Sequence, residues 1–551
     1  MNEITLPPLS LRALWAALIL LCAVLYLPGQ HRLPVMDRDE ARFAQATKQM
    51  LATGDYIDIR FQHESRYKKP VGIYWLQALS VRLAGTPEAI WAYRVPSLLS
   101  AIGTVLLLAW LVMRLGETRW AALAAGAILA CTVLLSVEAH LAKTDAALLV
   151  VITAVQAIIL CQYQAWQTGK QLRRHWVVGW WGLLGLGVLL KGPIVPLIAV
   201  LSLAWLKWVE KERGFAKTFW NPWGVGLAVA VILPWLVLIH KVSGGSFWRE
   251  AVVNDLLSKA ISGQESHGAP PLFYAALSPL LLWPFGGAVL LALLRVRRHR
   301  DHFVVRAALA WAVPTWVLFE LIPTKLPHYI LPTFPALVLL TVWVWRREGE
   351  RLFAPGGGRA ALRWCYGILS VVLTLAPVIL LPVVLGNEVH VISIFPAVVA
   401  ATFMIIATQP ATQMPIRFGA LVLGAALTYT SLFHLHVPAA QRLWISERLL
   451  TALNEAGVQH RPLAIAGFNE PSAVFTLGTG LRLTNGVGAA AFLIEHSDGI
   501  VMIESRQRPA FDAVVRSLKN PMPLTERGQV TGLNYSNGKT VDIHILEASE
   551  P

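Results

Sequence analysis

Long runs of apolar residues, separated by short polar loops, fill most of the first 436 residues of the chain. An α-helix needs about 20 mainly apolar residues to cross the hydrocarbon core of a bilayer. Thirteen runs of that order of length are present, and we expect each to form a membrane-spanning helix. They lie at about 11–28, 92–114, 119–137, 141–163, 175–190, 194–210, 223–241, 271–294, 303–322, 328–345, 362–386, 391–408 and 415–436.

The segment between the first two runs, 29–91, contains two shorter helix patterns. Apolar side chains recur at helical spacing from Glu40 to Leu51, and a glycine, Gly54, follows soon after. We therefore expect a short amphipathic helix that ends near this glycine. The apolar stretch 71–84 is short for a span and is interrupted by Arg82. We expect it to be partly embedded near the membrane surface rather than to cross.

The pattern changes after residue 436. Short apolar runs at 463–468, 481–483, 500–503 and 541–546 have the length of β-strands, and helix-like stretches at 440–458, 472–477, 489–495 and 510–518 separate most of them. This alternation predicts a small α/β domain. The segment has no glycine-rich phosphate motif between a strand and a helix, so we expect a structural or docking role.

The amino-acid composition is typical of a membrane protein. Hydrophobic residues make up 56% of the 551-residue chain and charged residues only 14%, and the mean hydropathy is +0.55. The net charge of +15 does not indicate nucleic-acid binding, because the basic residues cluster in short loops between apolar runs. Loops of this kind set the orientation of a membrane protein, since cytoplasmic loops are enriched in Lys and Arg.

The basic loops also predict the topology and the domains. They place the N-terminus in the cytoplasm, and thirteen crossings then bring the C-terminal segment to the outer side, which is the periplasm in a Gram-negative cell. We expect a mainly α-helical polytopic membrane domain at 1–436, which includes the outer loop 29–91 and the catalytic site. A soluble periplasmic α/β domain is expected at 437–551.

Acidic and basic side chains crowd the outer loop directly after the first span. Asp37, Asp39 and Glu40 are followed by Arg42, and Asp39 and Arg42 lie on one face of a helix at i, i+3 spacing. A second acid, Asp145, begins an apolar run on the same side, where an ionisable residue is a functional candidate by default. We expect Asp39, Glu40, Arg42 and Asp145 to be catalytic; the alternative is a solvated loop with local ion pairs.

Basic residues beside prolines and tight turns lie on that side as well. The candidates are Lys69, Lys191, Lys259 and Lys325, together with Tyr329. A single lysine here could simply extend to the lipid headgroups. Several together predict a phosphate-binding pocket, because the lysine ammonium is a compact point charge. Glu265 and His267 are weak candidates for a divalent cation, and no ligand spacing supports a zinc site.

These residues, in this order, resemble the family of 4-amino-4-deoxy-L-arabinose transferases that modify lipid A. Asp39-Glu40-Ala41-Arg42-Phe43 is similar to the family's Asp-Glu-x-Arg-Tyr, and Gly54-Asp55-Tyr56 to its Gly-Asp-Trp. Tyr67-Lys68-Lys69-Pro70 is similar to Phe-Glu-Lys-Pro, while Lys259 stands where the family has arginine. Three further matches are Lys191-Gly192, His267-x-x-Pro270 and Lys325-Leu-Pro-x-Tyr329-Ile-Leu-Pro332.

The resemblance implies a glycosyltransferase of the GT-C fold. The donor would be undecaprenyl phosphate carrying aminoarabinose, and the acceptor a lipid A phosphate at the periplasmic face of the bacterial inner membrane. Such a change lowers the negative charge that attracts polymyxin and other cationic peptides. The substrate-binding residues would be Tyr67, Lys69, Lys191, Lys259, His267, Lys325 and Tyr329.

Several points stay open at this level. No cofactor is expected, with a divalent cation as the alternative, and we expect a monomer that contacts membrane lipids and no nucleic acid. Transfer of the sugar to protein or to another glycan is the second enzymatic hypothesis. A lipid flippase or transporter is the third hypothesis; it would favour a polar site near the midplane of the membrane instead of charges gathered at one face.

Overall fold

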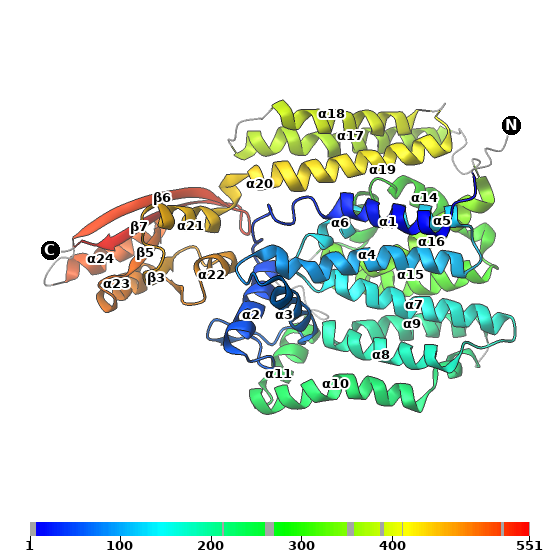
Figure 1. Ribbon diagram of the computed structural model, residues 1–551, viewed down its shortest axis with the longest axis horizontal. Helices are drawn as coiled ribbons and strands as arrows, with labels where there is room; N and C mark the ends of the chain where they lie inside the picture. The colour runs from blue at the N-terminus through cyan, green and yellow to red at the C-terminus, as the bar shows by residue number, and fades with distance from the viewer. Residues whose placement is uncertain are drawn as a thin grey trace.

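The computed structural model describes residues 7–211, 214–258, 269–349, 357–385, 391–409, 412–518 and 523–549. A bundle of helices forms the larger part of the molecule, and a small α/β unit lies against one end of it (Figure 1). The outer-loop helices α2 (Asp39–Thr53) and α3 (Gly72–Ala84) lie at that end, between the bundle and the α/β unit (Figure 1).

Every predicted apolar run contains a helix. The bundle helices are α1 (Leu11–Tyr26), α4 (Ile90–Arg114), α5 (Arg119–Ala130), α6 (Val133–Ala139), α7 (Asp145–Gln167), α8 (Arg174–Lys191), α9 (Ile194–Glu210), α10 (Pro222–Ser243), α13 (Phe273–Leu281), α14 (Gly286–Leu293), α15 (Phe303–Leu321), α16 (Phe334–Glu348), α17 (Gly357–Leu385), α18 (Val391–Thr408) and α19 (Met414–Ser431). Within the described ranges, seven helices are long and apolar enough to cross a bilayer, or eight with one bent pair. The chain is a multi-pass membrane protein, and the count of thirteen crossings stays a prediction.

Two of the predicted spans are broken. The run 119–137 forms α5 and α6, which meet at an angle of 68°. The run 271–294 forms α13 and α14, which are separated by a turn that contains Pro284. Proline has no backbone N–H to donate to the preceding helical turn, which accounts for this second break. The bend in the first pair brings the end of α6, with Glu138, next to the start of α7.

The outer segment contains a helix at each of its two predicted patterns, and the partial embedding of 71–84 stays a prediction. Helix α2 ends at Gly54, whose left-handed backbone (φ 75°) suits glycine. Helix α3 packs very closely against α8 at Gly72. A Cβ atom on this glycine would lie only 2.7 Å from the carbonyl oxygen of Leu189, so a larger residue would not fit without a shift. This close approach brings the loop with Lys69 beside Lys191, the last residue of α8.

The α/β unit is built on a five-stranded sheet of order β4-β3-β5-β7-β6. Strands β4 (Arg482–Thr484), β3 (Leu463–Ala466) and β5 (Ile500–Glu504) are parallel, whereas β7 (Lys539–Ala548) and β6 (Leu524–Asn534) are antiparallel. The helices α21 (Ile445–Glu455), α22 (Pro471–Leu477), α23 (Gly486–Glu495) and α24 (Arg508–Ser517) pack against the sheet. Strands or helices lie within each of the predicted stretches, and β6, few of whose residues are apolar, was not predicted. A soluble periplasmic domain stays a prediction.

Candidate active site

A polar cavity of about 90 Å³ lies where α2, the start of α7, the end of α8 and the turn before α16 meet. Its wall contains five cationic side chains and three carboxylates, so its net charge is +2 with histidine neutral. The charged residues are Arg42, Arg66, Lys68, Lys69, Lys191, Asp39, Asp145 and Asp255. Phe43, Thr144, Thr324, Leu326, His328 and Tyr329 complete the wall. An excess of positive charge at such a site favours an anionic ligand.

Asp39 is the first residue of α2, and its side chain is exposed to this cavity. Desolvation raises the pKa of its carboxyl group, but the positive charges of Lys143 and Arg66 outweigh it and hold the pKa below its ordinary value. Asp39 is therefore ionised at neutral pH. Arg42 lines the same cavity, although among the described ion pairs none joins it to Asp39 as the i, i+3 spacing predicts.

Asp145 lies at the centre of a compact network of charges. Its carboxylate accepts a hydrogen bond from Lys191 Nζ at 2.5 Å, lies 3.6 Å from Lys143 Nζ, and is 3.8 Å from His328 Nε2. Lys143 also donates to Glu138 at 2.9 Å. Because each of the two carboxylates faces an ammonium group, the network is charge-compensated although it is largely buried.

Lys69 and Tyr329 close the other side of the cavity. Lys69 pairs with Asp255 at 2.6 Å, in the π-helical turn η2 (Arg249–Leu257). Tyr329, in the 3₁₀ turn η4 (Pro327–Thr333), has Lys191 Nζ 5.7 Å from the centre of its ring. This distance is within the range of a cation–π contact, so Tyr329 orients the lysine as well as lining the cavity.

An apolar groove of about 320 Å³ continues from this polar cavity between the helices. The two spaces share Lys69, Asp145, Lys191, Asp255, His328 and Tyr329. The rest of the groove is lined by Leu148, Pro193, Ile194, Leu197, Leu318, Phe319, Ile322, Leu331 and Pro332. A cationic cavity that continues into an apolar groove is complementary to a molecule with an anionic end and a hydrocarbon tail.

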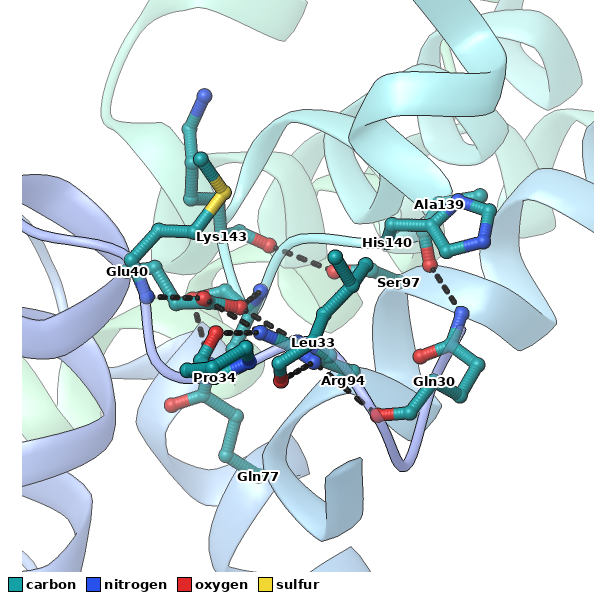
Figure 2. Close-up of polar contacts among 12 residues, drawn as sticks. Gln30, Leu33, Pro34, Glu40, Gln77, Arg94, Ser97, Ala139, His140 and Lys143 are labelled. Carbon is teal, nitrogen blue, oxygen red and sulfur yellow. Dashed lines mark hydrogen bonds and ion pairs between the residues drawn. The ribbon is translucent and has the colours of Figure 1, made fainter. Parts of the chain in front are cut away.

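The structure places the side chain of Glu40 away from the cavity. Its side chain is 1% exposed, and both carboxylate oxygens accept hydrogen bonds at 2.8 Å from the buried guanidinium of Arg94, on α4 (Figure 2). The backbone N–H groups of Met36 and Ala142 donate to the same carboxylate. Helical geometry turns residue 40 away from residue 39, so Glu40 holds the fold together and does not face the cavity.

Two of the predicted substrate-binding residues are also placed elsewhere. Tyr67 is 3% exposed, and its hydroxyl donates to Asp58 at 2.7 Å. Lys325 is 6% exposed and donates to the carbonyl oxygens of Glu320 and Ile322 at the end of α15, where unpaired helix carbonyls attract a cation. Neither residue lines the cavity. Lys259, Glu265 and His267 lie outside the described residues.

Glu138, Asp145 and His328 are the described residues that could together hold a metal ion, since their ligand atoms lie within 4.8 Å of one another. Lys143 and Lys191, however, already occupy these carboxylates at hydrogen-bond distance. A divalent cation would be repelled by both ammonium groups. The arrangement fits an internal ion network better than a metal site.

The sequence reasoning missed His328, Arg66 and Asp255. His328 belongs to the quoted motif around Lys325 and Tyr329, and its place beside that tyrosine was an available signal. Arg66 directly precedes the Tyr67-Lys68-Lys69-Pro70 motif. Asp255 gives no signal, because only the packing of the second outer loop brings it to Lys69.

Comparison with known proteins gives relatives for most of the chain. The family of dolichyl-phosphate-mannose-protein mannosyltransferases matches residues 68–238. An undecaprenyl phosphate-α-4-amino-4-deoxy-L-arabinose arabinosyl transferase of Edwardsiella ictaluri is 29% identical over 378 residues, 66% of this chain and 65% of that protein. A similarly named protein of Sodalis glossinidius is 30% identical over 61% of this chain and 59% of its own length. The matches thus span less than two thirds of the length of these relatives.

Solved structures establish the fold. ArnT from Cupriavidus metallidurans bound to undecaprenyl phosphate superposes with a TM-score of 0.74 at 18% identity, over 96% of this chain and 97% of ArnT. The oligosaccharyltransferase of Archaeoglobus fulgidus gives a TM-score of 0.51 at 11% identity, over 94% of this chain and 69% of that one. The chain therefore has the GT-C fold, and its curated relatives have the name of the family that its motifs resemble.

Proposed function

We propose that this chain is a membrane-embedded glycosyltransferase that moves 4-amino-4-deoxy-L-arabinose from undecaprenyl phosphate to a phosphate group of lipid A. The observation that carries the proposal is the continuity of the cationic cavity with the apolar groove. A polyprenyl-phosphate donor has the same two parts, a charged phosphate and a long hydrocarbon tail. The names of the curated relatives support this donor.

The donor phosphate would bind Lys69, Lys191 and Tyr329, with the prenyl chain in the groove. In the reaction, the bond between the anomeric carbon and the donor phosphate oxygen breaks, and the electron pair leaves with that oxygen. A lipid A phosphate oxygen attacks the same carbon from the opposite face and inverts it. The lysines stabilise the negative charge that grows on the leaving phosphate.

Asp39 lines the same cavity as the phosphate-binding lysines. A phosphate monoester has a second pKa of about 6 and is mostly ionised near neutral pH, so the acceptor needs little help from a base. The ionised Asp39 is suited to hold the ammonium group of the donor sugar or to orient the acceptor. Asp145 fixes Lys191 through their 2.5 Å ion pair.

We further propose that the reaction takes place at the periplasmic face of the inner membrane. The arginine-rich loops at the other end of the bundle favour a cytoplasmic location for that end. The cavity and the α/β unit would then face the periplasm, where the charge lost by lipid A weakens the attraction of cationic peptides.

A reconstituted reaction tests the proposal. Purified protein in proteoliposomes is given undecaprenyl phosphate-aminoarabinose and purified lipid A, and the lipid A is examined by mass spectrometry. We expect the mass increase of one aminoarabinose, and no increase with Asp39→Asn protein. Modification by the Asp39→Asn protein at the wild-type rate would reject the site, and no modification by the wild type would reject the acceptor.

The second candidate is transfer to protein, which the family match over 68–238 favours. That region contains Lys69 and Lys191, which we assign to the donor phosphate, and Asp145, which fixes Lys191. The family match therefore concerns the donor more than the acceptor. Adding peptide or glycan acceptors to the same proteoliposomes separates the two functions. Movement of labelled donor across the bilayer without transfer would instead indicate a flippase.

A further inference from the structure

The segment Met36–Asp39, which leads into α2, is held from its bundle side by Arg94. All five N–H groups of this fully buried guanidinium donate: two to Glu40 and one each to the carbonyl oxygens of Gln30, Leu33 and Pro34 (Figure 2). The distances are 2.8–3.0 Å. The chain on both sides of the segment is therefore fixed to α4.

The α/β unit holds the same segment from the other side. The backbone N–H of Asp37 donates to the hydroxyl of Tyr535 at 2.6 Å, and the carboxylate of Asp37 accepts from the backbone N–H of Ser472 at 3.0 Å. The guanidinium of Arg38 donates to the carbonyl oxygen of Ser536. Tyr535 and Ser536 belong to the turn between β6 and β7, almost 500 residues away in sequence.

The backbone between these two anchors is strained. Arg38 has φ 67° and ψ −110°, a conformation that residues with a side chain rarely adopt. Strain of this kind persists only where the surroundings over-determine it. It occurs one residue before Asp39, and it sets the direction in which α2 begins.

We infer that the β6–β7 turn of the α/β unit is a positioning device for Asp39, with Tyr535 as its main positioning residue. This inference rests on the proposed function, because it assigns a role to Asp39 in transfer. Tyr535 does not line the cavity, so it acts only through its contacts with Asp37. The remaining contacts of the unit with α2, such as Gln45 with Thr479 at 2.8 Å, serve docking alone.

Tyr535→Phe removes the hydroxyl and keeps the ring. Thr479→Val is the matched control, because it removes a hydroxyl from the same interface at a point remote from Asp39. In the proteoliposome reaction we expect Tyr535→Phe to lower kcat about tenfold and to leave the KM for donor within twofold of wild type. Thr479→Val should leave kcat unchanged, and both variants should keep similar thermal stability.

Hydrogen–deuterium exchange of residues 33–42 gives a readout that does not depend on activity. Exchange there should become faster in Tyr535→Phe and stay at the wild-type rate in Thr479→Val. Equal kcat values or equal exchange in the two variants would overturn the positioning role. If the wild type itself lacks transferase activity, the proposed function fails, and the exchange experiment alone then decides whether Tyr535 holds this segment.

A separate observation concerns the end of the bundle away from the α/β unit, where α14, α17, α18 and α19 enclose a mostly apolar groove of about 100 Å³. Its wall includes Ala288, Leu291 and Leu421, with Arg363 and Arg417 near the starts of α17 and α19. Figure 1 shows α19 running from that end towards the α/β unit.

Most polar groups of this groove have partners inside the protein, and Arg417 donates to the carbonyl oxygen of Gln409 at 3.0 Å. Tyr366 donates to the carbonyl oxygen of Pro279 at 2.6 Å, and Ser370 accepts from Trp283 at 2.9 Å. The Nε atom of Arg363, in contrast, is buried and has no hydrogen-bond partner among the described residues. A buried donor without a partner costs free energy that a bound acceptor recovers.

The geometry points to a binding site for an anionic glycerophospholipid. The lipid phosphate would accept from Arg363 and Arg417, and part of an acyl chain would fill the groove. Basic pockets between transmembrane helices bind anionic head groups in this way, with about 1 kcal/mol, or fivefold in affinity, for each cation near the surface. This site is independent of the transferase cavity.

Native mass spectrometry of the purified full-length protein tests it with phosphatidylglycerol and phosphatidylcholine as probes. We expect the wild type to retain one phosphatidylglycerol in preference to phosphatidylcholine, and Arg363→Gln with Arg417→Gln to bind it about 25-fold more weakly. Ala288→Phe fills the groove, keeps both charges, and should also lose the lipid. Arg300→Gln, an exposed arginine outside the groove, is the control. Undiminished binding by the double variant, or equal binding of both lipids, would overturn the site.

Discussion

Asp39 and Lys69 line the same cavity, but we assign Asp39 to the transfer step and Lys69 to donor binding. Asp39→Asn keeps the shape of the side chain and removes the charge. We expect kcat to fall at least about 100-fold with little change in the KM for donor, because a misplaced or lost catalytic contact typically costs this much. Steady-state kinetics in proteoliposomes measures the effect. Asp498→Asn, an exposed carboxylate of the α/β unit, is the control.

Substitution of Lys69 should change the KM for donor rather than kcat. Lys69→Met keeps most of the side-chain volume and removes the charge that we assign to the donor phosphate, so the KM for donor should rise about tenfold or more. The change also leaves Asp255 without its ion pair. The double variant Lys69→Met with Asp255→Asn tests whether that lone carboxylate contributes. An unchanged KM for donor in both variants would remove Lys69 from the phosphate site.

Single residues were predictable where a motif fixes both type and place. Asp39, Lys69, Lys191 and Tyr329 belong to such motifs and line the cavity, as does Asp145, which was predicted as an ionisable residue in an apolar run. Glu40, Tyr67 and Lys325 belong to the same motifs, yet they point into the protein. A motif gives nearness in sequence but not the direction of a side chain, which depends on helix phase and on partners such as Arg94.

At the scale of elements, the apolar pattern was the more reliable guide. The length of an apolar run predicts a helix but not a break within it, so the bends in 119–137 and 271–294 were missed. Strand β6 was missed for the converse reason: it lies at the edge of its sheet, where polar residues are tolerated. Both failures arise from tertiary packing, which a local pattern does not contain.

The ion pair of α2 with α4 should be essential for folding. Arg94→Met leaves the Glu40 carboxylate buried and removes the donors of three carbonyl groups, so we expect a loss of about 3–5 kcal/mol in the free energy of unfolding. Thermal unfolding in detergent measures this. Adding Glu40→Leu removes the uncompensated charge and should restore part of the stability. A double variant as unstable as Arg94→Met would contradict the assignment of the loss to that charge.

At the scale of the whole molecule, docking of the α/β unit on the bundle should depend on pH through Asp37. Burial raises the pKa of Asp37 to about 6, and the carboxylate of Glu470 adds to the rise, while hydrogen bonds from Ser472 and Tyr535 oppose it. Because the folded pKa lies above its ordinary value near 3.8, the stabilisation linked to this group is complete below about pH 4 and is lost as the pH rises through 6.

Asp37→Asn removes this titration and keeps an oxygen that accepts from Ser472. We therefore expect the variant to unfold at a higher temperature than wild type at pH 7.5, with a free energy of unfolding larger by up to about 3 kcal/mol, and at nearly the same temperature at pH 4. Thermal scans in detergent at the two values measure the difference, with Asp498→Asn as the control for a solvent-exposed carboxylate. A variant less stable than wild type at pH 7.5 would mean that the ionised Asp37 stabilises the interface, contrary to the raised pKa. The interface would then be tightest at neutral pH instead of in acid.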